Sequence, residues 1–390
     1  MRARTGGRRA VLLLAAAALA LTGCSDGLIL ANPVPTDRPI VRPEPTPARL
    51  PDPQPVVVPR DDGPHDRLTE WWYYTGHLQG KGGEELGFEF VIFRAERGLF
   101  PVSWASHLAI TDETGGRFHY DERVEIGPQV DRSPADGGFD LAVTGAPGMA
   151  MLVEPWTMAG AGGIDRHAAT GRSKQADGMP FGLDLRLDGS TFPIVLHDTD
   201  GYVDFGPAGG SYYYSRSKMT ATGTVTLGER TFDVTGRAWF DHQWGDFISV
   251  GGGGWDWFAV NLADGTDVTI SLVRAADGSY PIVYGTLVRP DGTFRHLPRE
   301  ELSVTATREW TSERTGATWP AGWRIEVPTE ALVIDLVPTV ADQELDTRTT
   351  TGVVYWEGSQ VVTATRAGVP LGGDAYVELT GYGPGALTTE

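Results

Sequence analysis

Most of the chain alternates apolar and polar residues with a period of two. Residues 71–78 and 87–94 are two clear examples, and a polar, glycine-rich stretch separates them. Successive side chains of a strand point to opposite faces of its sheet, so this alternation indicates strands, and the short connection indicates a hairpin. No long segment repeats its apolar residues at helical spacing. The pattern predicts an all-β fold of many short strands, arranged as barrels or sandwiches.

The hairpin predicted over residues 71–94 recurs about 180 residues later. Residues 255–274 repeat its order of aromatic and aliphatic positions around an Ala-Asp-Gly turn, and Arg274 falls at the position of Arg94. The segment that follows each hairpin also matches in outline. Matches in the same order at a constant spacing are typical of a duplicated domain. The chain is therefore expected to hold two copies of one β-domain.

The far ends of the two copies match as well, because residues 236–241 parallel residues 373–378. Tandem glycines at 251–254 lie where the first copy ends and the second begins, and glycine permits the close approach of a domain junction. The repeat predicts an N-terminal barrel over residues 61–246 and a C-terminal barrel over residues 247–390.

The first 23 residues have the layout of a secretory signal. Four arginines precede an apolar run at residues 10–21, which is too short to cross a bilayer. The run ends in Leu-Thr-Gly-Cys, which resembles the box of bacterial lipoproteins, whose cysteine is lipidated and becomes the first residue. We therefore expect residues 1–23 to be a lipoprotein signal peptide and Cys24 to be the lipid attachment site. An ordinary signal peptide with a chance cysteine is the alternative.

Residues 24–60 are expected to form a tether. They are rich in proline and show little apolar periodicity, so they favour extended polyproline conformations and bury little surface. Such a segment would hold a folded body away from a membrane, which predicts a lipid-anchored protein of the cell envelope, on its periplasmic or extracellular face. Cys24 is the only cysteine in the chain, which excludes disulfides and thiol catalysis in the folded body.

The chain is acidic, with 51 Asp and Glu residues against 32 Lys and Arg residues and a net charge of −19. The signal segment holds four of the arginines and no acid, so its removal takes the 32 basic residues to 28. A body of this charge repels phosphate backbones and anionic surfaces. Nucleic acid is therefore not an expected partner.

Three motifs together resemble the CrtC/AttH-like family. They lie at residues 70–78, 212–216 and 241–245, and the similarity extends over about residues 61–383. The family includes bacterial carotenoid 1,2-hydratases, AttH-type proteins encoded with ABC exporters, and distant fungal pericyclases. The resemblance implies two tandem lipocalin-like, calycin-type β-barrel domains with a mainly apolar site at or near their interface.

The resemblance also bears on chemistry, because His242 and Trp244 correspond to the active-site histidine and tryptophan of the hydratase branch. That branch further relies on a Tyr-x-Asp pair a few dozen residues later, whose aspartate is the proposed proton donor to an alkene. The corresponding residues 268–273 contain neither Tyr nor Asp. Alkene hydration needs an acid aimed at a carbon atom, and that acid is absent from its usual place.

Three ionisable residues are the candidate catalytic groups, namely Glu70, Asp241 and His242. Neighbouring strand residues point to opposite faces, so Asp241 and His242 share one pocket only if a bulge intervenes. In the alternative, Asp241 caps a turn and His242 fills a domain interface. Glu70 precedes two tryptophans and would be a proton donor if burial raised its pKa. The favoured interpretation of Glu70 is a structural ion pair, with Arg94 or Arg216 as its partner.

Aromatic residues of the motifs are expected to line the binding site for an extended apolar ligand, although ordinary core packing explains several of them. His77, His107 and His242 lack the short spacing of zinc ligands, so neither a metal nor another cofactor is expected. The expected ligand-binding residues are Trp71, Trp72, Tyr73, His107, Tyr214, Arg216, Trp244, Trp255 and Trp356.

Two functions from different classes follow. In the first, the chain is an envelope lipoprotein that holds a long apolar molecule, such as a lipid or polyene, between its barrels and works beside an ABC exporter. In the second, the same scaffold is an enzyme of acid-assisted alkene chemistry, such as hydration or cyclisation. The missing acid and the lipoprotein anchor favour binding. In either case we expect one apolar cavity at the domain interface, lined by Glu70, Trp72, Tyr214, His242 and Trp244.

Overall fold

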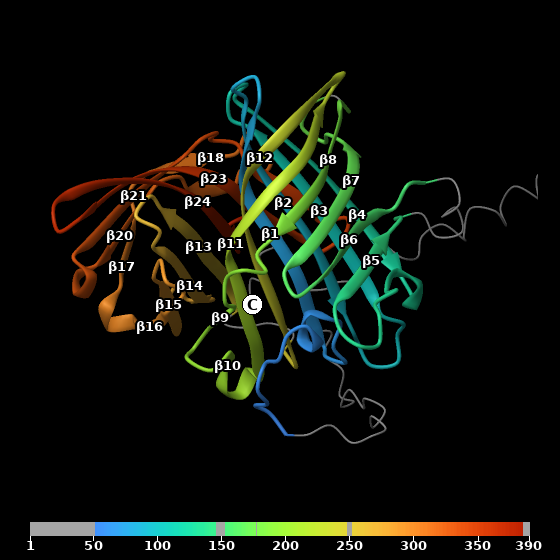
Figure 1. Ribbon diagram of the computed structural model, residues 1–390, viewed down its shortest axis with the longest axis horizontal. Helices are drawn as coiled ribbons and strands as arrows, with labels where there is room; N and C mark the ends of the chain where they lie inside the picture. Colours follow the sequence, from blue (N-terminus) through green and yellow to red (C-terminus); the bar gives the residue numbers. More distant parts are fainter. Residues whose placement is uncertain (1–50, 146–152, 177, 248–251, 385–390) are drawn as a thin grey trace, which may run out of the picture.

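The computed structural model describes residues 51–145, 153–176, 178–247 and 252–384 (Figure 1). Nearly all regular structure in these ranges is antiparallel β-sheet, accompanied by short 3₁₀ turns. Cys24, the signal segment and most of the expected tether lie outside the described residues. Within the described ranges, no helix has the length and apolar character needed to cross a membrane. The predicted all-β fold is confirmed.

The N-terminal half forms one curled sheet of twelve strands. Its strands are β1 (Thr69–Gly80), β2 (Glu85–Ala95), β3 (Ser103–Asp112), β4 (Arg117–Ile126), β5 (Phe139–Val143), β6 (Trp156–Ala161), β7 (Ile164–Arg172), β8 (Pro180–Asp188), β9 (Val195–Leu196), β10 (Tyr202–Asp204), β11 (Gly210–Leu227) and β12 (Arg230–Gly245). The order is β4-β3-β2-β1-β12-β11-β8-β7-β6-β5, and β9 and β10 both pair with β11.

The C-terminal half forms a second sheet of ten strands and a small two-stranded ribbon. The sheet contains β13 (Gly252–Leu262), β14 (Asp267–Ala275), β15 (Ile282–Val288), β16 (Phe294–Pro298), β17 (Ser303–Ala306), β20 (Trp323–Val327), β21 (Leu332–Pro338), β22 (Glu344–Thr347), β23 (Val353–Arg366) and β24 (Val369–Thr380), and the ribbon contains β18 (Glu309–Thr311) and β19 (Thr318–Pro320). The main path is β16-β15-β14-β13-β24-β23-β21-β20-β17, with β22 on β23. The 3₁₀ turns are η1 (Arg60–Asp62), η2 (Pro128–Val130), η3 (Gly206–Ala208), η4 (Arg299–Glu301) and η5 (Pro328–Glu330).

The strand pairings confirm the repeat read from the sequence. In each sheet the first strand lies between the second strand and the last strand, so β1 lies between β2 and β12, and β13 lies between β14 and β24. The register matches too. Trp71 pairs with Phe93, which is the residue before Arg94, and Trp255 pairs with Val273, which is the residue before Arg274. The two sheets therefore have the same topology, as expected for two tandem lipocalin-like units. The first sheet ends at Gly245 and the second begins at Gly252.

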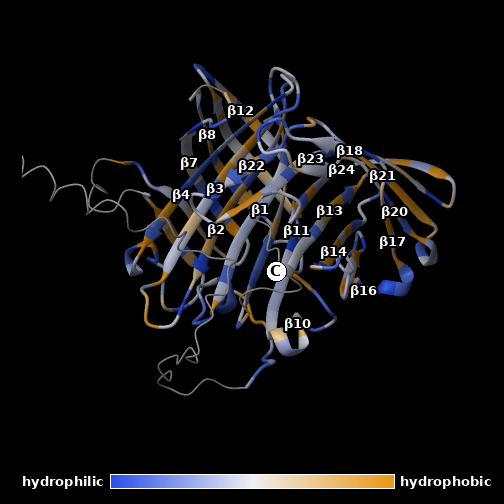
Figure 2. Cartoon of the chain, turned by 180° about the vertical axis from the view of Figure 1, so that it is seen from behind, coloured by the Kyte–Doolittle hydropathy of each residue, from blue (hydrophilic) through white to orange (hydrophobic). Residues whose placement is uncertain are grey.

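Each sheet curls around its own apolar core, and the two sheets pack against each other (Figure 1). Apolar and polar residues alternate along many strands in Figure 2, which is the pattern from which the strands were predicted. A separate aromatic cluster fills the contact between the sheets, where Tyr73 and Trp239 of the first sheet meet Trp257 and Tyr376 of the second. The central strands β1 and β12 thus have one face toward a barrel interior and the other toward the second sheet.

Candidate functional site

The strands β1, β12 and β11 separate the predicted site residues into two groups. Trp72 pairs with His242, and His242 pairs with Tyr214, so these three side chains share the face that points into the first barrel. The next row pairs Asp241 with its neighbours on β1 and β11 and faces the second sheet. The β1–β12 pairing runs without a register shift, so Asp241 and His242 do not share a pocket.

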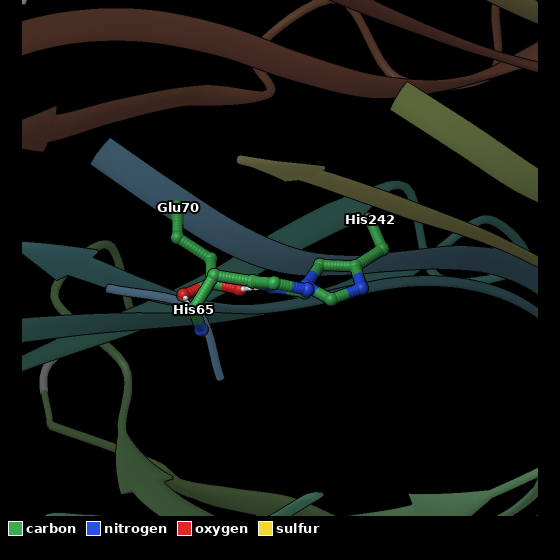
Figure 3. A group of neighbouring side chains, drawn as sticks. All are labelled: His65, Glu70 and His242. Carbon is green, nitrogen blue, oxygen red and sulfur yellow. Dashed lines mark hydrogen bonds and ion pairs between the residues drawn. The ribbon is translucent and has the colours of Figure 1, made fainter. Parts of the chain in front are cut away.

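Glu70 and His242 do meet inside the first barrel, and a third residue joins them. The Glu70 carboxylate lies 3.0 Å from His242 Nε2 and 2.7 Å from His65 Nδ1, and its second oxygen accepts the His65 backbone N–H at 2.9 Å. Figure 3 shows the three side chains converging. His65 comes from the segment before β1 and was not anticipated, because no motif or spacing marks it.

Aromatic rings surround this group, which is called the His65–Glu70–His242 cluster below. The His65 ring stacks on Trp244 with a centroid distance of 4.0 Å, and the His242 ring lies 4.8 Å from Trp72. Glu70 and His242 are fully buried, whereas the His65 side chain keeps 19% of its exposure. The predicted lining residues Trp72, Tyr214 and Trp244 are therefore brought together, but in the barrel interior and not at the interface.

The electrostatics of the cluster follow from its contacts. Burial opposes ionisation of Glu70, but the imidazoles of His65 and His242 outweigh it and hold the pKa of Glu70 at about 2. Burial also disfavours protonated His65, yet Glu70 and Asp61 raise its pKa. Burial dominates at His242 and lowers its pKa. The condition under which Glu70 would be a proton donor, a pKa raised by burial, is therefore not met.

The expected ion pair between Glu70 and an arginine is not formed. Arg216 instead donates to Asp62 at 2.9 Å, and the Tyr214 hydroxyl donates to the same carboxylate oxygen. Arg94 donates to Glu96 and to the Arg67 carbonyl. The second oxygen of Asp62 accepts a backbone N–H from the β6–β7 turn at 2.7 Å. Arg216 thus fixes η1 over the barrel interior and does not reach the interface.

The opposite face of the central strands carries a polar network against the second sheet. Asp241 accepts hydrogen bonds from the Ser215 hydroxyl, from Tyr213 at 2.5 Å and from the Trp239 indole at 2.6 Å. Trp257 of the second sheet donates to Tyr213 at 3.0 Å. Burial raises the pKa of Asp241 to about 6 although these donors oppose the shift.

Three glutamates gather beside this network, and we call them the interface carboxyl cluster. Glu357 on β23 pairs directly with Glu378 on β24, and Tyr73 of the first sheet donates to Glu357 at 2.7 Å. Glu89 on β2 adds a third carboxyl group, which interacts electrostatically with the other two. Among the described residues, both oxygens of Glu89 and one oxygen of Glu357 have no hydrogen-bond partner.

Burial and mutual repulsion keep protons on these glutamates. Burial raises the pKa of Glu378 to about 7, and nearby Asp241 adds to the shift. Burial and the neighbouring carboxyl groups raise the pKa of Glu89 and of Glu357 well above the ordinary value. Like charges directly opposite each other in a sheet are unfavourable, so at least one member of the Glu357–Glu378 pair stays neutral near pH 7.

The internal repeat contains a signal for Glu378. Glu378 lies at the position of Asp241 in the internal repeat, and the two strands β12 and β24 present them to the same interface. The pairing of Glu357 with Glu378 and the approach of Glu89 depend on tertiary contacts. Glu378 is only partly buried, and Trp255, at the start of β13, is 39% exposed at the same side.

The remaining predicted residues are dispersed. His107 lies between the sheets, where its Nδ1 contacts the Tyr355 hydroxyl at 2.7 Å, so it does not approach His242. Trp71 is a partly buried neighbour of the interface aromatic cluster. Trp356 belongs to the core of the second barrel and lines no site between the barrels.

Two hollows accompany these groups. A surface cleft of about 480 Å³ is lined by Tyr120, Glu122, Lys174, Asp346, Arg348 and Thr349. A cavity of about 10 Å³ lies between β1, β12, β13 and β24, with Trp239, Ala259 and Tyr376 in its wall. Neither is lined by His242 or Glu70. The prediction that His242 lines a cavity at the domain interface is wrong, because its side chain lies on the face of β12 that points into the first barrel.

Comparisons with known proteins agree with the fold. The sequence profile of the AttH-like family matches residues 49–382. A crystal structure described as an AttH of Nitrosomonas europaea is 30% identical, covers 84% of this chain and 98% of its own, and gives a TM-score of 0.71. Kievitone hydratase of Nectria haematococca is 15% identical, covers 80% of this chain and 88% of its own, and gives a TM-score of 0.60. Among curated proteins, no sequence matches the chain.

Proposed function

This chain belongs to the AttH-like family, and from that premise we propose that it binds an apolar, unsaturated molecule at the partly exposed edge of the contact between its two sheets and protonates it there. The observation that carries the proposal is the interface carboxyl cluster. Carboxylic acids that stay protonated near neutral pH are the donors that acid-assisted alkene chemistry requires. The hydratase-like fold of a distant relative supports the scaffold and says nothing of the substrate.

The acid in this proposal is Glu378. It is the member of the cluster that is partly exposed, and it lies opposite Trp257 on β13 as well as opposite Glu357. The stretch of β14 in which the hydratase branch carries its Tyr-x-Asp pair has Thr269 and Ser271 on the buried interface instead. The acid that is missing from β14 is therefore supplied from β24.

The proposed reaction is the addition of water to a carbon–carbon double bond. Glu378 transfers its proton to one alkene carbon, and a cation forms on the other carbon. The rings of Tyr73 and Trp257 meet edge to face, with 5.3 Å between their centroids. In the proposal, the open faces of these rings stabilise the cation by cation–π attraction. A water molecule then adds its oxygen to the cation and returns a proton to the Glu378 carboxylate, so that atoms and charge balance.

The cellular part of the proposal rests on the sequence. Cys24 is the proposed lipid attachment site, which would place the body at the envelope where apolar molecules accumulate, beside an ABC exporter. Replacing Cys24 with Ala should release the protein from the membrane fraction. Unchanged membrane association of that variant would contradict the anchor without affecting the chemistry.

The enzymatic part is tested with an acyclic carotenoid as the probe. The purified full chain is incubated with it in oxygen-18 water, and the product mass is measured. We expect a gain of one labelled water, which Glu378→Gln abolishes while carotenoid binding is kept. Glu113→Gln is the matched control, because Glu113 lies at the edge of the same interface and bonds to Ser359.

The outcomes separate the two functions. Labelled product from the wild type but not from Glu378→Gln supports the enzyme. Binding without product in every variant overturns the reaction and supports a binding protein of the same site. Absence of binding overturns both.

A further inference from the structure

The His65–Glu70–His242 cluster plays no part in the proposed reaction. It lies inside the first barrel, and β12 separates it from the interface carboxyl cluster. We propose that these three residues form a binding site for one divalent transition-metal ion, and that Zn²⁺ is the ion that suits it.

The geometry of the three ligand atoms carries the proposal. One nitrogen of each imidazole and one oxygen of Glu70 lie within 4.8 Å of one another. Glu70 Oε1 is 2.7 Å from His65 Nδ1 and 3.0 Å from His242 Nε2. Tetrahedral zinc with bonds of about 2.0 to 2.1 Å needs ligand atoms roughly 3.3 Å apart. The two Glu70–imidazole contacts would therefore lengthen by about 0.3 to 0.6 Å around an ion, and the separation of the two imidazole nitrogens, within 4.8 Å, would shorten by up to about 1.5 Å.

The donor set is the second argument. Two imidazoles and one carboxylate are the ligands of many zinc sites that keep a fourth position for water. The folded body contains no cysteine, so no thiolate ligand is present to select a soft metal ion such as Cu(I). The side of the cluster formed by His65 is partly exposed, which gives an ion and its water a route of entry.

Surrounding contacts hold two of the ligands in place, as outer-shell partners do in metal sites. The His65 Nε2 lies 3.7 Å from Asp61, and Asp61 is itself held by the Val57 backbone N–H at 2.6 Å. The second oxygen of Glu70 accepts the His65 N–H. For His242, stacking against aromatic rings fixes the ring plane, while its Nδ1 has no partner among the described side chains and backbone.

An ion at this position would join two parts of the chain. His65 belongs to the segment that precedes β1, whereas Glu70 and His242 lie on paired central strands. A ligand that binds the folded state alone stabilises it by mass action. Zinc should therefore raise the melting temperature of the whole first barrel and not only order a loop.

The test measures metal binding directly and uses the full chain with Cys24→Ser, so that the lone thiol does not compete. Zn²⁺ is titrated by calorimetry, bound zinc is counted after dialysis, and Co²⁺ is added to read the visible absorption of a tetrahedral site. We expect one ion per chain. His65→Ala should weaken binding at least tenfold, and its partly exposed position leaves the fold intact, which circular dichroism checks.

Two controls keep the result specific. His77→Ala removes another histidine that lies beside a glutamate, with 3.6 Å between His77 Nδ1 and Glu113, but without a third ligand, and it should bind zinc as the parent does. The Glu378→Gln variant should also bind zinc as the parent does. Failure of the metal proposal can therefore be told apart from failure of the proposed reaction. No zinc uptake by the parent, or equal uptake by His65→Ala, would overturn the proposal. The cluster would then be a structural group of ion pairs inside the first barrel.

Discussion

The two barrels share one topology but differ in the ionisable groups that they carry at the same end of the first hairpin. In the second barrel, Asp256 on β13 bonds to Arg274 on β14 at 3.1 Å and also accepts from Tyr280 and Tyr382. The carboxylate is fully buried and has a partner for each oxygen. In the first barrel, Trp72 occupies the position of Asp256, and the ionisable groups are Glu70 and two histidines.

The difference is one of chemistry. An arginine keeps its charge and its donors at every accessible pH, so the Asp256–Arg274 pair is a closed structural contact. Imidazoles exchange protons and offer lone pairs to metals. The two barrels are thus similar scaffolds, and in the first the same region carries groups that can exchange protons and offer lone pairs.

The largest effect is expected from breaking the structural pair of the second barrel. Asp256→Ala leaves Arg274 buried, with its side chain about 10% exposed, and should lower the free energy of unfolding by about 3 to 5 kcal/mol. Urea denaturation of the purified chain measures it. A loss below about 1 kcal/mol would show that the pair behaves like a surface contact.

A smaller effect is expected on ligand affinity, and it distinguishes the two faces of the central strands. Trp257→Ala removes an aromatic wall of the interface and should weaken binding of a polyene by about 1 to 3 kcal/mol. Trp244→Phe, inside the first barrel, should leave affinity unchanged, which reverses the expectation from sequence. Tryptophan fluorescence titration decides, and equal losses in both variants would place the ligand elsewhere.

The pH dependence of the interface has a definite sign. Burial raises the pKa of Glu378 to about 7 in the folded chain, so the folded state holds the proton over a range in which the unfolded chain has released it. The stabilising contribution of Glu378 is fully present below the pKa that this group has in the unfolded chain, and it is lost as the pH rises toward 7. Unfolding free energy should fall across that range by no more than about 1.4 kcal/mol per pH unit for one proton.

Glu378→Gln should flatten this dependence, whereas Glu113→Gln should keep it. Turnover, if Glu378 is the acid, should also decline as pH rises through about 7. A wild-type stability that rises steadily with pH from 4 to 7 would contradict the assignment of the titrating group.

The smallest effect is expected at an exposed ion pair of the first barrel. Lys81 and Asp233 lie 2.7 Å apart at the end of β1 and the start of β12, with side chains 78% and 61% exposed. Lys81→Ala should change the free energy of unfolding by about 0 to 1 kcal/mol, because water screens both charges. The same urea series measures it, and 1 M salt should remove the remainder.

Part of the site could be predicted because it follows from strand periodicity. Asp241 and His242 are adjacent on a strand, so their separation onto opposite faces is expected unless a bulge intervenes, and the pairing contains none. Periodicity does not say which face points into the barrel. Placing His242 and Trp244 at the domain interface was wrong for that reason.

The remaining residues of the site could not be predicted from the sequence, because their roles depend on long-range contacts. His65 lies in an irregular segment with no repeating pattern, and its contact with Glu70 depends on how that segment enters the barrel. Glu89 and Glu357 are isolated acids in apolar strands, and an acid in such a place is informative only once its burial is known. Their grouping joins strands from both halves of the chain.

The sequence by itself determined the strands, the hairpins and the duplication, because these depend on local side-chain alternation and on ordered repetition along the chain. Tertiary structure alone decided which face of β1 and β12 is enclosed, that His65 completes a cluster with Glu70 and His242, and that Glu357 meets Glu378 beside Glu89. The physical reason is that sheet register and sheet packing bring together residues far apart in the chain. Their pKa values then follow from burial and from neighbours that no local pattern specifies.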